Sequence, residues 1–150
     1  MMSVNETALS LLNRSQMQAL QQRNAQQMKV NLCAIARNEA KVAHDSAVVL
    51  VERREFELST AQTSHTDFVK YLRESPEQTN SAIQATWADL AQKLEDALGR
   101  LNAARSQAAS KKVALDEAEQ LLAFHSDKLR QLIEDHRGVL REIERLSQPA

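Results

Sequence analysis

The sequence predicts an all-α protein, namely a long antiparallel two-helix coiled-coil hairpin with its turn near Ser75-Pro76. Three observations lead to this fold class. Good helix formers dominate the composition, apolar residues recur every three or four positions, and the helical pattern is interrupted once, near the midpoint. Only two glycines and two prolines occur among 150 residues. A fold with many elements would need more of these residues, because they form turns and end helices and strands.

The first arm of this hairpin is expected over about residues 4–73. A capping box formed by Ser3 and Glu6 marks its start. Its best seam, the line of residues that faces the other arm, consists of Ala40, Ala47, Val51, Leu58, Ala61, Phe68 and Leu72, with His44, Arg54 and His65 in phase. Before residue 40 the phase shifts, and a looser stripe is expected at Leu9, Leu12, Met17, Leu20, Met28, Leu32 and Ile35.

The break between the arms is expected to start the second helix. Proline disfavours helix at the residue before it but suits the first position of a new helix, which here is Pro76. We therefore expect Ser75 to be the N-cap, with Gln78 completing a capping box. The second arm is then expected over about residues 76–147, and the two arms form a single domain over residues 1–150.

The second arm carries the stronger seam, in which only Lys111, His125 and His136 are not apolar. Its positions are Ile83, Trp87, Leu90, Leu94, Ala97, Leu101, Ala104, Ala108, Lys111, Leu115, Ala118, Leu122, His125, Leu129, Leu132, His136, Val139, Ile143 and Leu146. Such a stripe over about nine heptads is typical of a left-handed coiled coil. The register stays open, as does the choice between arms that fold on each other and arms that pair between chains.

Several function classes find no support in the sequence. A net charge of −1 argues against a nucleic-acid binder. No phosphate-binding glycine loop, HExxH or CxxC pattern occurs, and we expect no catalytic residue, metal, cofactor or small-molecule substrate. The single cysteine, Cys33, fits a reducing compartment, and no apolar run is long enough to cross a membrane, so a cytoplasmic protein without membrane insertion is expected.

Two groups of residues are candidates for partner binding. A basic segment contains Arg14, Arg23, Lys29, Arg37 and Lys41 and would suit an acidic partner surface. An ordinary solvated helix face is the alternative interpretation. Phe68, Tyr71 and Trp87 gather near the break in a chain with only 3% aromatic residues. These side chains either lock the turn or contact a partner, because Trp and Tyr are common interface anchors.

A hairpin of this size, break position and composition resembles, over nearly the whole chain, the ATPase stalk proteins of type III secretion systems. These are the YscO-, HrpO- and SctO-like proteins, which are related to flagellar FliJ. The resemblance implies a non-enzymatic virulence protein at the inner-membrane-associated secretion machinery. It implies contact with the secretion ATPase hexamer and the export gate protein, and with secretion chaperones. The alternative is a self-assembling structural or secreted coiled-coil protein of a secretion apparatus.

Overall fold

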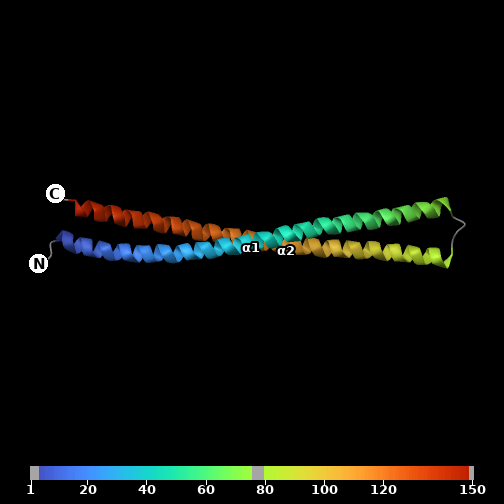
Figure 1. The fold of residues 1–150 in the computed structure, drawn as a ribbon, viewed down its shortest axis with the longest axis horizontal. Helices are drawn as coiled ribbons and strands as arrows, with labels where there is room; N and C mark the ends of the chain where they lie inside the picture. Colours follow the sequence, from blue (N-terminus) through green and yellow to red (C-terminus); the bar gives the residue numbers. More distant parts are fainter. Residues whose placement is uncertain (1–3, 76–79, 149–150) are drawn as a thin grey trace. The chain divides into compact units, whose positions relative to one another are not determined.

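The computed structural model describes residues 4–75 and 80–148, which form two long helices. Helix α1 is Val4–Glu74 and helix α2 is Ser81–Ser147. The two helices pack against each other as an antiparallel hairpin (Figure 1), and the described ranges contain no strand. The all-α helical hairpin is therefore confirmed.

The chain divides into two compact units. The terminal unit combines residues of Met1–Glu39 with residues of Asp116–Ala150, and the connecting unit is Ala40–Leu115. In each unit a segment of α1 packs against a segment of α2. A single domain over residues 1–150 stays a prediction.

The seam of α2 lies where the sequence predicts it. All of its predicted positions are buried or half-buried except Trp87, which is 40% exposed. The predicted α1 seam from Ala40 to Leu72 is likewise buried or half-buried throughout. A continuous spacing of three and four residues keeps one face of each helix turned toward the other, which explains the agreement.

Small side chains dominate the core of the connecting unit. Its buried apolar residues are Ala47, Ala97, Leu101, Ala104 and Leu115. Leu101 is the most deeply buried of them, with 2% of its surface exposed. Alanine on facing seams lets two helix backbones approach closely, so the packing in this unit depends on short side chains around a few leucines.

The predicted stripe before residue 40 is partly wrong. Leu9, Leu12 and Leu20 face inward, but Met17, Met28, Leu32 and Ile35 are each more than half exposed. The inward positions of this stretch are instead Arg23, Gln26, Val30, Cys33, Ala34 and Arg37. They continue the spacing of the Ala40 seam toward the N-terminus. Helix geometry therefore keeps polar residues in the seam and turns the larger apolar ones outward.

The start of α2 also differs from the prediction. The helix begins at Ser81, and the side-chain oxygen of Asn80 accepts a hydrogen bond from the backbone N–H of Ile83 at 2.9 Å. Asn80 is thus the N-cap, a role for which asparagine ranks among the best residues. Placing the N-cap at Ser75 was wrong. The predicted partners Pro76 and Gln78, and Ser3 at the other end of the chain, lie outside the described residues.

Candidate interaction surfaces

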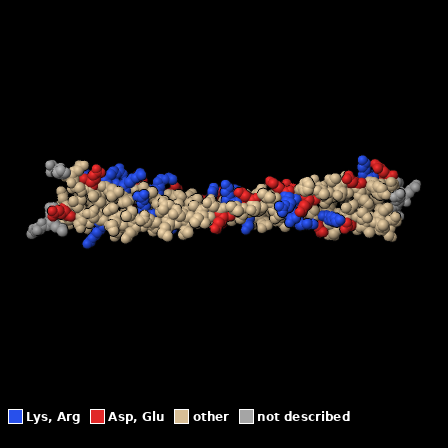
Figure 2. Space-filling view, viewed as in Figure 1, with Lys and Arg blue, Asp and Glu red and all other residues tan. Residues whose placement is uncertain are grey.

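The basic segment is divided between two environments. Arg14, Lys29 and Lys41 are exposed, whereas Arg23 and Arg37 are half-buried in the interface between the helices. The Nε of Arg37 lies 3.7 Å from a carboxylate oxygen of Glu119. Figure 2 shows charged side chains of both signs interspersed with uncharged surface. The structure therefore does not bring all five cations together as one outward-facing surface.

Arg23 instead belongs to a polar layer inside the terminal unit. Its Nη1 lies 3.4 Å from Nδ1 of His136, which is only 5% exposed. A guanidinium can only donate, so Nδ1 accepts and the imidazole proton resides on Nε2. That Nε2 is buried and has no hydrogen-bond partner among residues 4–75 and 80–148. His136 thus satisfies one ring nitrogen and leaves the other without a partner.

Gln26 forms the second contact of this polar layer. Its side-chain amide lies 3.0 Å from Nδ1 of His125 and donates to the His125 carbonyl oxygen, also at 3.0 Å. Gln26 is 3% exposed. Such pairs fix which residues of two helices stand opposite each other, because any slip leaves the amide buried without a partner. The sequence showed the two histidines as seam positions but gave no sign of Gln26 or Arg23 as their partners.

The aromatic residues near the break do form a cluster in the connecting unit. The ring centroid of Phe68 lies 6.2 Å from that of Tyr71 and 6.1 Å from that of Trp87. The ring centroids of His65 and Trp87 are 5.2 Å apart. These distances suit favourable aromatic packing. Tyr71 and Trp87 are nevertheless 43% and 40% exposed. The cluster therefore packs α1 against α2 and still presents two aromatic edges to solvent.

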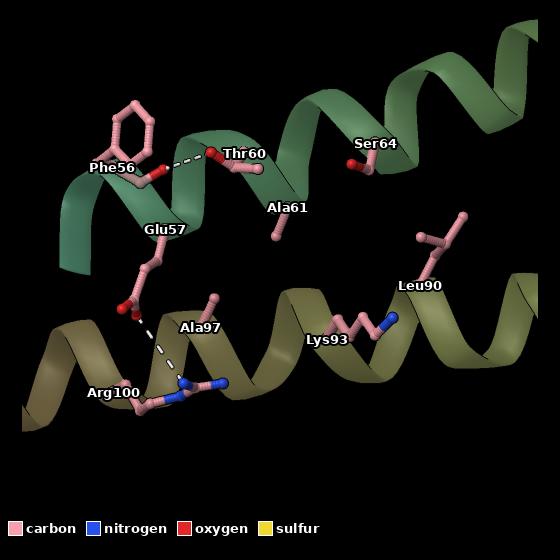
Figure 3. Close-up of a pocket in the computed structure, with 9 residues that line it drawn as sticks. All are labelled: Phe56, Glu57, Thr60, Ala61, Ser64, Leu90, Lys93, Ala97 and Arg100. Atoms are coloured by element: carbon pink, nitrogen blue, oxygen red, sulfur yellow. Dashed lines mark hydrogen bonds and ion pairs between the residues drawn. The ribbon is translucent and has the colours of Figure 1, made fainter. Parts of the chain in front are cut away.

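A shallow apolar groove of about 480 Å³ lies between the helices of the connecting unit. Figure 3 shows Ala61, Leu90 and Ala97 directed into the space between the ribbons. The residues that line it are Phe56, Glu57, Thr60, Ala61, Ser64, Leu90, Lys93, Ala97 and Arg100. Sequence reasoning missed this groove, although small residues at two facing seam positions were a signal that space would remain.

Charged side chains border this groove. Arg54 donates to both carboxylate oxygens of Glu57, at 2.8 and 2.9 Å, and Arg100 lies 3.9 Å from the same carboxylate. The hydrogen bond from Arg54, together with the nearby positive charges, holds the pKa of Glu57 below its ordinary value. The hydroxyl of Thr60 donates to the backbone carbonyl of Phe56. The border is thus held by contacts within the unit.

The described residues contain neither a metal-binding cluster nor a membrane-spanning stretch. No group of three or more His, Cys, Asp or Glu side chains is placed to hold a metal ion among residues 4–75 and 80–148. Neither described helix has a stretch long and apolar enough for a membrane crossing.

The comparisons with known proteins identify no relative. No protein-family model, no curated protein and no solved structure matches the chain. The features of the described residues that bear on function are a helical hairpin with an exposed aromatic edge, the exposed cations Arg14, Lys29 and Lys41 of the basic segment, and a polar layer between the helices.

Proposed function

We propose that the chain is the non-enzymatic central stalk of a type III protein secretion apparatus, which contacts the hexameric export ATPase and links it to the export gate. The supporting observation is the fold, in which two long helices packed antiparallel take up nearly all described residues. A packed helix pair resists bending better than a single helix. It therefore suits a part that transmits a change at one partner to another.

Two surfaces are available for the proposed contacts. The exposed edges of Tyr71 and Trp87 provide aromatic anchors, which often carry much of the binding energy at an interface. The exposed cations Arg14, Lys29 and Lys41 provide long-range attraction to acidic surfaces, which affects association rate and orientation. In this proposal the aromatic edge contacts the ATPase, and secretion chaperones bind elsewhere on the hairpin at the cytoplasmic side of the inner membrane.

The first test is binding of the full chain to the hexameric type III secretion ATPase of the same organism, measured together with ATP hydrolysis. Binding accompanied by faster hydrolysis is expected. Replacement of Trp87 and Tyr71 by alanine should weaken binding at least about tenfold, the loss expected when interface anchors are removed.

The matched control is Leu98→Ala, because Leu98 lies in the same unit and is 47% exposed but does not belong to the aromatic cluster. It should leave affinity within about twofold. Circular dichroism of each variant must show unchanged helicity. A chain that neither binds the ATPase nor changes its hydrolysis rate is not its stalk.

A further inference from the structure

One side of the terminal unit presents an exposed surface to which both of its helices contribute. We call it the terminal face. The large apolar side chains on it, Leu32, Leu121 and Phe124, are 64%, 52% and 62% exposed. Its residues, all of them exposed, form one row on α1 and one on α2, namely Lys29, Leu32, Ala36 and Glu39, and Lys128, Phe124, Leu121 and Glu117.

The structure places the two rows side by side. Lys29 of α1 and Lys128 of α2 line the same depression between the helices. From these lysines each row continues in steps of three or four residues, a spacing that keeps side chains on one side of a helix. Because the helices are antiparallel, the two rows run in the same direction from there. The contact of Arg37 with Glu119, at 3.7 Å, confirms this alignment near the other end of the rows.

The opposite side of the same stretch provides a comparison within the unit. One residue corresponds to about 100° of rotation around a helix. Lys29 precedes the inward Val30 and Gln27 follows the inward Gln26, so these two side chains lie on opposite sides of α1. The opposite side has no large apolar residue among Gln27, Asn31, Ala34, Asn38, Glu119, Ala123, Ser126 and Arg130. Leucine and phenylalanine exposed on one side only therefore mark that side as an interaction surface.

The two ends of the terminal face carry charges of opposite sign. Lys29 and Lys128 form one end, and Glu39 and Glu117 form the other. Within residues 4–75 and 80–148, none of these four side chains takes part in an ion pair. The carboxylate next to Lys128 in the sequence, that of Asp127, lies 3.3 Å from Arg130 instead. An acidic partner would suit only one end of the face, whereas a second copy of the face, turned end over end, suits both.

The spacing of the rows also suits a second copy. The middle of the row on α1 is at residue 34, and the middle of the row on α2 is between residues 122 and 123. Both middles lie at one level, because the two rows run side by side from the same depression. A single two-fold axis through this level therefore pairs both rows, and it uses the same surface on both copies. The residues brought opposite each other in the two copies are Lys29 and Glu39, Leu32 and Ala36, Lys128 and Glu117, and Phe124 and Leu121.

We propose that two copies of this chain pair through the terminal face, with the lysine end of each copy against the glutamate end of the other. Eight side chains per copy form a small interface, so a dissociation constant on the order of 10 micromolar or weaker is expected, and dilute samples are mostly monomeric. The pairing does not depend on the proposed stalk function, and either proposal can fail alone.

Sedimentation of the full chain, from micromolar to millimolar concentration, tests the pairing. A monomer–dimer equilibrium is expected. Lys29→Glu places a carboxylate against Glu39 of the other copy, twice in each dimer, and should weaken the dimer about tenfold. Glu39→Lys should weaken it to a similar extent. The double variant that carries both substitutions restores opposite charges and should recover the original affinity to within about threefold.

Two controls accompany these variants. Arg14→Glu changes the net charge as Lys29→Glu does, at an exposed position of the same unit outside the terminal face, and should leave the equilibrium unchanged. Replacing Leu32 and Phe124 by serine should abolish the dimer, whereas Leu140→Ser, at a leucine that is 42% exposed outside the face, should not. Circular dichroism should show the same helicity for each charge variant, because glutamate and lysine are both good helix formers.

Three results would overturn the proposal. The first is a chain that stays monomeric at millimolar concentration, and the second is a dimer that Arg14→Glu weakens as much as Lys29→Glu. The third is a double variant that fails to recover the affinity lost in the single variants, because opposite ends of the two faces would then not meet.

Discussion

The terminal and connecting units use the same spacing of seam residues but fill it with different chemistry. In the connecting unit the buried residues are alanines and leucines. Among the described residues of the terminal unit, those that are buried are the apolar Leu129 and the polar Gln26 and His136. Apolar layers mainly stabilise a coiled coil, whereas polar layers specify its register at a cost in stability. The comparison teaches that one periodic pattern can serve both purposes along a single pair of helices.

The largest effect is expected when the terminal unit loses its leucines. Replacing Leu122 and Leu129 by serine removes two inward apolar side chains. The loss of a buried leucine such as Leu129 costs about 2–5 kcal/mol, and the half-buried Leu122 adds a smaller loss. The inward apolar residues that remain in this unit, such as Leu132, Val139 and Ile143, are only half-buried. Hydrogen exchange followed by mass spectrometry should show residues 4–39 and 116–148 losing protection while the connecting unit stays protected.

The control for this experiment uses two exposed leucines of the same unit. Leu121→Ser combined with Leu140→Ser changes side chains that are 52% and 42% exposed, and protection should be close to that of the unchanged chain. Native protection in the Leu122 and Leu129 variant would contradict the assignment of this seam.

A smaller effect of opposite sign is expected at His136. Its buried Nε2 finds no partner among the described side chains and backbone, so His136→Leu should stabilise the protein by about 1–2 kcal/mol in chemical denaturation. Arg23 is half-buried and can turn toward solvent once the imidazole is gone. Gln26→Leu is the informative counterpart, because it leaves His125 without its amide donor and should destabilise the protein. If both substitutions changed the free energy of unfolding in the same direction, the polar layer would not act as described.

Each unit contains one glycine inside α2, which allows a direct comparison. A Cβ added at Gly99 or Gly138 meets nothing within 4 Å. Alanine at either position should therefore stabilise its unit by up to about 1 kcal/mol through helix propensity alone. Thermal unfolding measures the total gain in stability, and hydrogen exchange shows which unit has gained it. Destabilisation at either site would indicate that a partner surface needs the space.

The smallest effect concerns pH. Because Arg54 lowers the pKa of Glu57, their interaction stabilises the folded state above the ordinary glutamate pKa of 4.5. This contribution is lost as the pH falls below 4.5 and through the lowered pKa of the folded state. The melting temperatures of the unchanged chain and of Glu57→Gln should therefore converge in acid. Glu142, whose pKa Arg145 lowers in the same way, provides the matching substitution Glu142→Gln in the terminal unit.

The sequence predicted best where large apolar residues mark one face and the other faces are polar, as in α2. It failed on α1 between Met17 and Arg37, because large apolar residues lie on the outer side of that stretch, whereas its inner side carries Arg23, Gln26 and Arg37 together with smaller apolar residues. Hydrophobicity alone selects the wrong side there, since the true seam is set by continuity with Ala40 and by the partners of Gln26 and Arg23. The Asn80 cap was missed because a serine before a proline is an equally familiar start signal.

The candidate surfaces were predictable to a similar extent. The aromatic cluster was predictable because its members lie near the break in the sequence. The groove was not, because it depends on the distance in space between two segments that contain alanine, and the sequence does not give that distance. The division of the basic segment likewise required knowing the rotation of α1 about its axis.

The antiparallel arrangement also imposes an order on folding. His65 and Trp87 contact each other across 22 residues, whereas Arg23 and His136 are separated by 113. Closing the larger loop directly costs about 1.5 kcal/mol more chain entropy. The connecting unit is therefore expected to close first and the terminal unit to follow by zippering toward the chain ends. During synthesis on the ribosome residues 4–39 must wait for residues 116–148, and until then the inward side chains of Leu9, Leu12 and Leu20 stay uncovered.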